Sequence, residues 1–394
     1  ITEQEEIEAF LQPGGAVAPP LEIKDMQKAA VRVLQAINCF EKICVYGDYD
    51  ADGVTATALL FSYLESCGAN VMYYIPNREG EGYGMNCTAV EYLHQQGVRL
   101  IITVDNGIAS LEEIRLANRL GMEVVVTDHH QPQGELPEAV AVVDPHREDC
   151  PSRFKQLAGV GVAFKLMMAL EGEDADPQGL LENYADLIAI GTIGDVVPLT
   201  GENRVFVKAG LRALLHTDRA GLRALLDAAG MQGRKITAGS VSFGLVPRIN
   251  AAGRLGSCDS AVRLLLSDYE EEASDFAVHI NEENRNRQEI EAEILREVEE
   301  LLAHEPQRRY DRVLVMEGEG WHHGVIGIVA SRVVERYGKP CIMIGTLGEE
   351  ARGSGRSIPG FSLYDAIFHC REYLTRFGGH PMAAGLSMET SQIP

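Results

Sequence analysis

The sequence predicts an α/β protein in which a parallel, doubly wound sheet and a smaller α/β domain are joined by a long helix. Three observations lead to this prediction. Strand-like and helical patterns alternate between residues 26 and 143. One amphipathic pattern then extends from about residue 271 to residue 304, and a second strand–helix alternation follows it. We therefore expect an N-terminal domain at 1–270, a connecting helix at 271–306 and a C-terminal domain at 307–394.

The first domain alternates short β-branched runs with helices whose apolar residues recur at 3–4 spacing. An acidic helix and a Pro/Gly loop at 13–20 are expected before the first long helix. The expected strands are 43–46, 71–75, 100–104, 124–127 and 139–143. The expected helices are 26–37, 54–66, 87–95, 110–120 and 159–170. Ser110 and Glu113 have the spacing of a capping box at the start of one of them.

The rest of the chain is predicted in less detail. Short helices are expected between residues 201 and 266, with an interruption at 243–254. In the second domain, the pattern predicts strands at 313–316 and 341–344, helices at 327–337 and 363–375, and a strand that begins near residue 383. Glycine-rich loops are expected at 353–357 and 377–381. The chain ends soon after the last strand, so we expect the second domain to be truncated.

An acidic motif follows the first expected strand. Asp48, Asp50 and Asp52 stand at alternate positions between Gly47 and Gly53. At a separation of about 5 Å and an effective dielectric near 20, each close pair of carboxylates costs roughly 3 kcal/mol. A bound divalent cation would remove that repulsion. A solvated acidic turn is the alternative interpretation of this motif by itself.

Three other expected strands also run directly into an aspartate, namely Asp105, Asp128 and Asp144. In a doubly wound sheet, ligands bind beyond the carboxyl ends of the strands. A nearly continuous apolar segment at 185–193 stops just before Asp195, which is a further candidate ligand. The recurrence of aspartates at one edge of the sheet favours a metal site over a solvated turn.

Carboxylates with some imidazole suit Mn²⁺ or Mg²⁺ better than structural Zn²⁺, for which thiolates are typical. So many acids predict two ions, which would activate a water and clamp a phosphoryl group. Asp128 is as well suited to orient a histidine as to bind metal. His130 could bind a metal or donate to the phosphate, and His146 could belong to the site or to a loop. The candidate set is Asp48, Asp50, Asp52, Asp105, Asp144, Asp195, His129 and His130.

Composition limits the class of protein. The first ten residues are acidic without an apolar core, and no run of about 18 apolar residues occurs. Eight scattered cysteines without a C-x-x-C pair are typical of reduced thiols. These features predict a cytoplasmic protein that spans no membrane. The net charge of −23 argues against a protein that coats nucleic acid, but it allows a local basic groove.

Several cations lie in glycine-rich stretches, where we expect turns that let a phosphate approach the backbone. His322 and His323, beside Trp321, could contact a base or form a packed corner. The cations and their neighbours that we expect to bind phosphate are Arg78, Arg248, Arg254, Ser354, Arg356 and His380.

Eight motifs in order resemble the DHH phosphoesterase superfamily and, within it, the bacterial RecJ family of single-strand-specific exonucleases. The first four are VYGDYDADGVTATALL, ITVDNGI, VVTDHHQP with VDPH, and IGDVVPL. The other four are PRINAAGRLG, GWHHGVIGIVASR, GSGRSIPG and GGHPMAAG. The resemblance extends from about residue 24 to residue 386.

This resemblance implies roles for individual residues. It implies that Asp50, Asp52, Asp105, His129 and Asp195 bind the metal pair, with Asp48 and His130 close by. Asp48 completes the predicted metal set, and Asp105, His129 and His130 form the predicted catalytic set. The residues implied to bind substrate, mostly around a DNA 5′ end, are Arg78, Arg248, Asn250, Arg254, Ser354, Arg356 and His380.

The resemblance also implies a function: 5′-to-3′ hydrolysis of single-stranded DNA to 5′-mononucleotides in recombination and repair. A nanoRNase or cyclic-dinucleotide phosphodiesterase of the same superfamily is the alternative. An inactive scaffold in a replication complex is the alternative from another class. We expect a monomer to which a helicase and a single-strand-binding protein supply single-stranded DNA. We find no room for the OB-fold that RecJ enzymes carry, which affects the expected processivity and affinity.

Overall fold

The structure is a computed structural model that describes residues 7, 10–11, 17–78, 81–172 and 176–393. Most of the acidic helix and the first half of the loop expected at the start of the chain lie outside these residues. The chain divides into a first unit up to Glu283 and a second unit from Asn284. This division falls inside the long helix, and the predicted boundaries at residues 270 and 306 stay a prediction. Among the described residues, no helix combines the length and the apolar character needed to span a membrane.

The first unit is built on five parallel strands in the order β2-β1-β3-β4-β5. Because β1 lies between β2 and β3, the chain reverses direction across the sheet at β1, which makes the β1–β3 edge the point where ligands bind in such sheets. This confirms the predicted doubly wound sheet. The strands are β1 (Ile43–Tyr46), β2 (Val71–Tyr74), β3 (Leu100–Val104), β4 (Glu123–Thr127) and β5 (Ala141–Val143).

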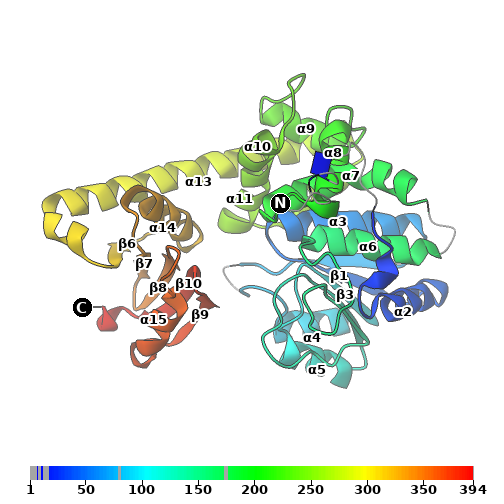
Figure 1. The fold of residues 1–394 in the computed structure, drawn as a ribbon, viewed down its shortest axis with the longest axis horizontal. Coiled ribbons are helices and arrows are strands. Elements are labelled where there is room, and N and C mark those ends of the chain that lie inside the picture. The colour runs from blue at the N-terminus through cyan, green and yellow to red at the C-terminus, as the bar shows by residue number, and fades with distance from the viewer. Residues whose placement is uncertain (1–6, 8–9, 12–16, 79–80, 173–175, 394) are drawn as a thin grey trace. The chain divides into compact units, whose positions relative to one another are not determined.

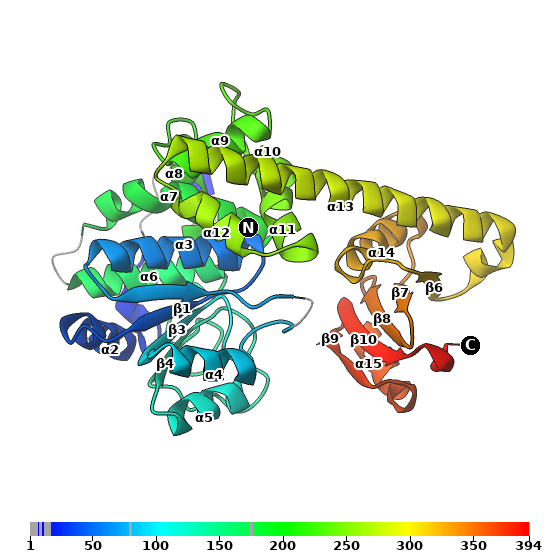
Figure 2. The same cartoon turned by 180° about the vertical axis from the view of Figure 1, so that it is seen from behind.

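Helices cover both faces of this sheet (Figures 1 and 2). Alternate residues of β1 point to opposite faces: Ile43 and Val45 join the core with α2, α3 and α6, whereas Cys44 and Tyr46 join the core with α4 and α5. The helices are α2 (Met26–Asn38), α3 (Ala51–Ser66), α4 (Cys87–Gln95), α5 (Leu111–Arg119) and α6 (Gly159–Glu171). Ser110 precedes α5, but its side chain makes no capping hydrogen bond, so the predicted capping box is wrong.

A helical extension follows the sheet. Its helices are α7 (Pro177–Gly194), α8 (Gly201–Ala213), α9 (Ala220–Ala228), α10 (Ala238–Ser240), α11 (Val246–Leu255) and α12 (Asp259–Leu266). The predicted interruption at 243–254 is wrong, because a π-helical turn (Val241–Leu245) leads directly into α11. Pro247 stands near the start of α11, directly after this π-helical turn. Gly253 does not break the helix either. A Cβ there would lie 2.5 Å from the carbonyl oxygen of Tyr49, so this glycine allows close packing.

The second unit contains another five-stranded sheet in the order β6-β7-β8-β10-β9, in which only the β6–β7 pair is parallel. The long helix α13 (Glu270–His304) precedes it, as predicted. Helix α14 lies on one face of this sheet and α15 on the other (Figure 2). The elements are β6 (Leu314–Glu319), α14 (His323–Tyr337), β7 (Cys341–Leu347), β8 (Glu350–Arg356), α15 (Leu363–His369), β9 (Arg376–His380) and β10 (Ala383–Glu389).

The glycine-rich stretches of the second unit form strands β8 and β9, so the prediction of loops there is wrong. The glycines of β8 give room for packing. A Cβ at Gly353 would lie 2.8 Å from Leu386, and one at Gly355 would lie 2.5 Å from Leu363 at the start of α15. The same residue type therefore serves close contact across a sheet here, and not a turn.

Candidate metal centre

The acidic motif folds into the loop between β1 and α3. A Cβ at Gly47 would lie 1.9 Å from Thr57 Oγ1, and one at Gly53 would lie 2.6 Å from the carbonyl oxygen of Asp48. These two glycines let the loop pack tightly against α3. Asp50 then caps the helix, because its Oδ1 accepts hydrogen bonds from the N–H groups of Asp52 at 2.9 Å and of Gly53 at 3.1 Å.

The start of α6 holds Asp52 from the other side. Its two carboxylate oxygens accept hydrogen bonds from Gly159 N at 2.6 Å and from Val160 N at 2.9 Å. The G-x-G at this helix start thus binds a carboxylate of the chain itself. Gly159 is also packed against Asp105, since a Cβ there would lie 2.6 Å from the Cβ of Asp105.

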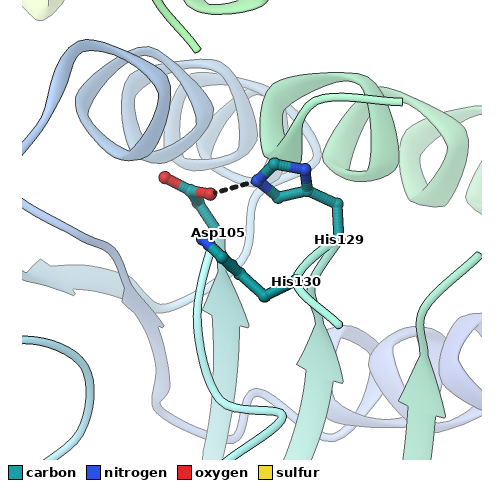
Figure 3. Close-up of side chains that lie close together, drawn as sticks. All are labelled: Asp105, His129 and His130. Atoms are coloured by element: carbon teal, nitrogen blue, oxygen red, sulfur yellow. Dashed lines mark hydrogen bonds and ion pairs between the residues drawn. The ribbon is translucent and has the colours of Figure 1, made fainter. Parts of the chain in front are cut away.

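Asp105 and His129 face one another at the ends of the neighbouring strands β3 and β4 (Figure 3). Asp105 Oδ1 lies 3.0 Å from His129 Nε2. His129 Nε2 is also 3.9 Å from Asp52 Oδ2, and His129 Nδ1 is 3.6 Å from Asp195 Oδ2. The imidazole of His129 is therefore surrounded by three carboxylates that come from distant parts of the chain.

Side chains of the described residues form three groups whose donor atoms lie within 4.8 Å of one another. Together they contain all six residues of the predicted metal set, and Asp105 and His129 each belong to two groups. The groups are Asp48, Asp50 and Asp105; Asp52, His129 and Asp195; and Asp105, His129 and His130. Asp48 Oδ1 is buried and has no hydrogen-bond partner. An oxygen-rich set with one buried, unpartnered carboxylate oxygen fits hard divalent cations.

The electrostatics of these carboxylates also favour bound divalent cations. Burial, followed by the charges of nearby carboxylates, raises the pKa of Asp105 and of Asp48 well above the usual value. Burial and the charge of Asp195 raise the pKa of Asp52 to about 7, and burial and the charge of Asp50 raise that of Asp195 to about 7. The protein alone does not stabilise four ionised carboxylates in this place, and cations would.

Asp128 positions the neighbouring histidines and belongs to none of the three groups. Its carboxylate accepts hydrogen bonds from the backbone N–H groups of Ile108, His129 and His130. His130 Nδ1 lies 2.7 Å from the same carboxylate. Burial opposes ionisation of Asp128, but the contact with His130 outweighs it and holds the pKa below its usual value. Although burial disfavours the charged ring, the same hydrogen bond raises the pKa of His130 to about 9.

Asp144 and His146 lie behind the site. Asp144 Oδ1 accepts a hydrogen bond from the backbone N–H of His146 at 2.7 Å. His146 Nδ1 lies 2.5 Å from the carbonyl oxygen of His129, so this ring supports the backbone that carries His129. Asp144 belongs to none of the three groups found among the described residues.

The predicted substrate residues of the first unit are placed differently from the expectation. Arg248 and Arg254 lie on α11, which corrects the expectation of glycine-rich turns. Arg248 donates to the carbonyl oxygen of Gly244 at 2.6 Å. Asn250 Oδ1 accepts from the N–H of Ala51 at 2.7 Å, so α11 is attached to the acidic loop.

Arg78 stacks on Tyr49, the aromatic residue within the acidic motif. Its guanidinium carbon is 5.1 Å from the centre of the Tyr49 ring. This cation–π contact fixes the arginine beside the acidic motif of the same unit.

In the second unit, Ser354 and Arg356 lie on β8 and His380 on β9. Arg356 donates to Ser354 Oγ at 3.2 Å. The corner at Trp321 is packed: the indole is 4% exposed and donates to Glu297 at 2.7 Å. His322 caps α14 by accepting from the N–H of Gly324.

Tyr83 was missed from the sequence. Its hydroxyl lies 3.3 Å from the carbonyl oxygen of Asp105 and 3.2 Å from His130 Nε2, while the side chain is 53% exposed. Its position between Gly82 and Gly84 was the only available signal, and such a pattern fits any loop.

Two family models match this chain. The DHH family, N-terminal domain, matches residues 42–192, which include the sheet and every residue of the three metal groups except Asp195. The DHHA1 domain matches residues 311–394, which include the second sheet.

Individual proteins and structures are similar over nearly the whole chain. The single-stranded-DNA-specific exonuclease RecJ of Bacillus subtilis (strain 168) is 45% identical over 377 residues, which is 95% of this chain and 47% of that protein. The RecJ of Escherichia coli (strain K12) is 40% identical over 95% of this chain and 68% of that protein. The chain thus spans about half the length of the first relative and about two thirds of the second.

Among solved structures, exonuclease RecJ bound to manganese matches with a TM-score of 0.83 and 38% identity, covering 95% of this chain and 93% of that one. RecJ from Thermus thermophilus in complex with Mn²⁺ matches with a TM-score of 0.85 and 36% identity, covering 98% of this chain and 55% of that one. On these similarities of sequence and fold, this chain belongs to the RecJ family.

Proposed function

We propose that this chain is the catalytic core of a two-metal exonuclease that degrades single-stranded DNA from the 5′ end to 5′-mononucleotides. The three overlapping groups that share Asp105 and His129 carry this proposal. Its substrate is supported by the RecJ relatives, which are named single-stranded-DNA-specific exonucleases, and its polarity is an implication of the motif resemblance.

In this proposal, Asp48, Asp50, Asp52, Asp105, His129 and Asp195 hold two Mn²⁺ or Mg²⁺ ions. The ions supply an activated water and compensate the charge of the phosphate. His130 is held by Asp128 through Nδ1, which leaves Nε2 and the Tyr83 hydroxyl toward the substrate. His130, with a raised pKa, would carry a proton that can be donated to a phosphate oxygen or to the leaving oxygen.

The residues that we propose to contact the substrate follow from the same motif resemblance. Arg78, Arg248, Asn250 and Arg254 in the first unit, and Ser354, Arg356 and His380 in the second, would bind the strand near its 5′ end. We further infer that a helicase and a single-strand-binding protein supply the strand in the cytoplasm, and that the chain acts as a monomer.

End-labelled digestion tests the function. Wild-type protein with Mn²⁺ should release mononucleotides from 5′-labelled single-stranded DNA, and chelator should stop the release. Asp105→Asn should abolish it, because the amide loses the charge but tolerates the left-handed backbone at this position (φ 62°). Asp227→Asn, on the exposed side of α9, is the charge-matched control and should retain activity.

Three results would contradict the proposal. A full rate in excess chelator would exclude the metal mechanism. Hydrolysis of dinucleotides without attack on long strands would support the phosphodiesterase alternative. Binding of DNA without any hydrolysis in Mn²⁺ would support the inactive scaffold.

A further inference from the structure

Strands β8, β10 and β9 of the second unit present three rows of residues on one face. The strands are antiparallel, and residues two apart on a strand point to the same face. We call the nine residues of these rows the cationic face. Written from β8 through β10 to β9, the rows are Arg352, Ser387 and Arg376; Ser354, Gly385 and Gly378; and Arg356, Ala383 and His380.

The cationic face is exposed to solvent over β9 and part of β10. The opposite face of β10 carries Ala384 and Leu386, which are buried in the core with α15. Helix α14 lies on the same side as the cationic face and packs against its β8 edge, where a Cβ at Gly327 would lie 2.8 Å from Ser354 Oγ. The exposed members are Arg352, Arg376, Gly378, His380 and Gly385.

The charge of this face is opposite to that of the chain. The chain has a net charge of −23, yet every charged side chain of the nine residues is an arginine, and the face also holds one histidine. Acidic residues come only in the next row, where Glu350 pairs with Glu389 beyond Arg352. Arg352 Nη2 lies 3.8 Å from Glu350 Oε2, and both side chains are exposed.

The Arg376 side chain on β9 is exposed and has no partner within the chain as described. Within the part of the chain that the structure describes, this side chain forms no hydrogen bond, ion pair or ring contact. A guanidinium offers five donors in a planar fork that fits phosphate oxygens. An exposed arginine with no partner in a strongly acidic chain is suited to an anion from outside the chain.

The middle row gives such an anion access to the backbone. At Gly378, no atom lies within 4 Å of the position that a Cβ would occupy, and at Gly385 the nearest is 3.9 Å away. Rows on one face of a strand are about 7 Å apart, so the two outer rows are separated by about 14 Å. This separation means that the outer rows would contact different phosphates of a linear polyanion.

We propose that Arg352 and Arg376 bind a backbone phosphate of the single-stranded DNA, further from the 5′ end than the phosphate bound near Arg356 and His380. This inference rests on the proposed function and adds two residues to it. The contact is made to the charged phosphate and not to the bases, so it should not depend on the DNA sequence.

Salt-dependent binding tests the inference. The full chain carrying Asp105→Asn binds a 3′-labelled oligo-dT strand at several salt concentrations, and Arg352→Gln and Arg376→Gln are added to it. Each substitution should reduce the slope of log K against log [salt] by about 0.7. The double variant should bind about tenfold more weakly at low salt. Oligo-dA should give the same differences.

Arg371→Gln is the matched control. Arg371 is exposed in the same unit but stacks on Phe368 of α15, away from the cationic face. This variant has the same change in net charge and should keep the wild-type slope. Thermal unfolding of each variant should match the parent protein, which excludes loss of the fold as the cause.

Neutral methylphosphonate linkages locate the phosphate. Placed one at a time from the 5′ end, they should weaken binding of the parent protein at one linkage beyond the first, and this linkage should make no difference to the double variant. Unchanged salt slopes, or equal sensitivity of parent and variant at every linkage, would overturn the inference while wild-type digestion stays intact. If wild-type protein neither binds nor degrades the strand, the proposed function itself fails.

Discussion

Asp105 shows how a single residue can depend on one neighbour. It adopts a left-handed backbone conformation (φ 62°), which is unfavourable for residues other than glycine, asparagine and aspartate. Gly159 at the start of α6 lies directly against it, and its N–H also holds Asp52. The position of two central carboxylates therefore depends on the absence of one methyl group.

We expect Gly159→Ala to reduce exonuclease activity strongly and to lower the free energy of unfolding by about 1–3 kcal/mol, as overpacking does. The added Cβ would lie 2.6 Å from Asp105 Cβ and 2.8 Å from its Oδ1. Activity and urea unfolding measure the two effects. Gly161→Ala in the same helix is the control, because its Cβ would meet the side chains of Leu157 at 3.3 Å and Phe206 at 3.8 Å, and neither belongs to the metal centre. Equal losses in both variants would show that the effect is not specific to Asp105.

Residues that end a strand were predictable, and residues placed by a loop were not. Asp105 and His129 follow buried strands, and parallel strands bring their carboxyl ends to one edge, so their proximity could be expected from the sequence. Tyr83 reaches the site through a loop whose path no periodicity specifies. Arg248 and Arg254 were placed in turns because glycines there were interpreted as turn residues.

At the scale of elements, Arg147 connects the loop after β5 to the start of α2. Its guanidinium donates to Asp25 Oδ2 at 2.8 Å, to the carbonyl oxygen of Val142 at 2.5 Å and to both carboxylate oxygens of Asp149. Burial of Asp25 acts against its ionisation, but the contacts with Arg147 and Lys28 outweigh it and hold the pKa below 3.8.

The pH dependence follows from the sign of that shift. A carboxyl whose pKa is lower in the folded state stabilises the fold above pH 3.8, and this contribution is lost as the pH falls through the folded pKa. Asp25→Asn should therefore lower the free energy of unfolding by about 1 kcal/mol at pH 7 and by progressively less below pH 4. Urea unfolding across this range measures it, with Asp227→Asn as control. A difference that persists undiminished at pH 3 would contradict this origin.

The sheet of the second unit predicts another contrast between glycines. Gly355→Ala should lower the free energy of unfolding by about 1–3 kcal/mol, because its Cβ would lie 2.5 Å from Leu363 at the start of α15. Gly378→Ala should have little effect on stability, since nothing lies within 4 Å of its Cβ position. Chemical unfolding of the two variants distinguishes them, and a larger loss for Gly378→Ala would be inconsistent with this packing.

Elements with strong periodicity were predicted almost to the residue, as β1, β3, α4 and α13 show. Strands β8 and β9 were predicted as loops, because two glycines in each of them remove the apolar signal that marks a strand. The packing of Leu363 and Leu386 explains why glycine is required in β8, and these contacts join residues that are distant in the sequence.

At the scale of the whole molecule, binding of cations should stabilise the fold. The carboxylates of the candidate metal centre repel one another, and a ligand that binds only the folded state adds to its stability. With free Mn²⁺ at about a hundred times its Kd, the free energy of unfolding should rise by about 2.7 kcal/mol.

Thermal unfolding with Mn²⁺ and with chelator measures this gain. Asp105→Asn should lose most of the shift in Tm, and Asp227→Asn should keep it. An equal shift in all three proteins would place the bound ions elsewhere.

The candidate metal centre also depends on the order in which the chain is synthesised. Its residues extend from Asp48, just after β1, to Asp195, the residue that ends α7. At ribosomal rates of about 5–20 residues per second, Asp195 appears roughly 7 to 30 s after Asp48. During that interval the acidic loop has no complete partner set, so a nascent chain would bind ions weakly. Ions that bind only after α7 has docked should slow unfolding more than they accelerate folding.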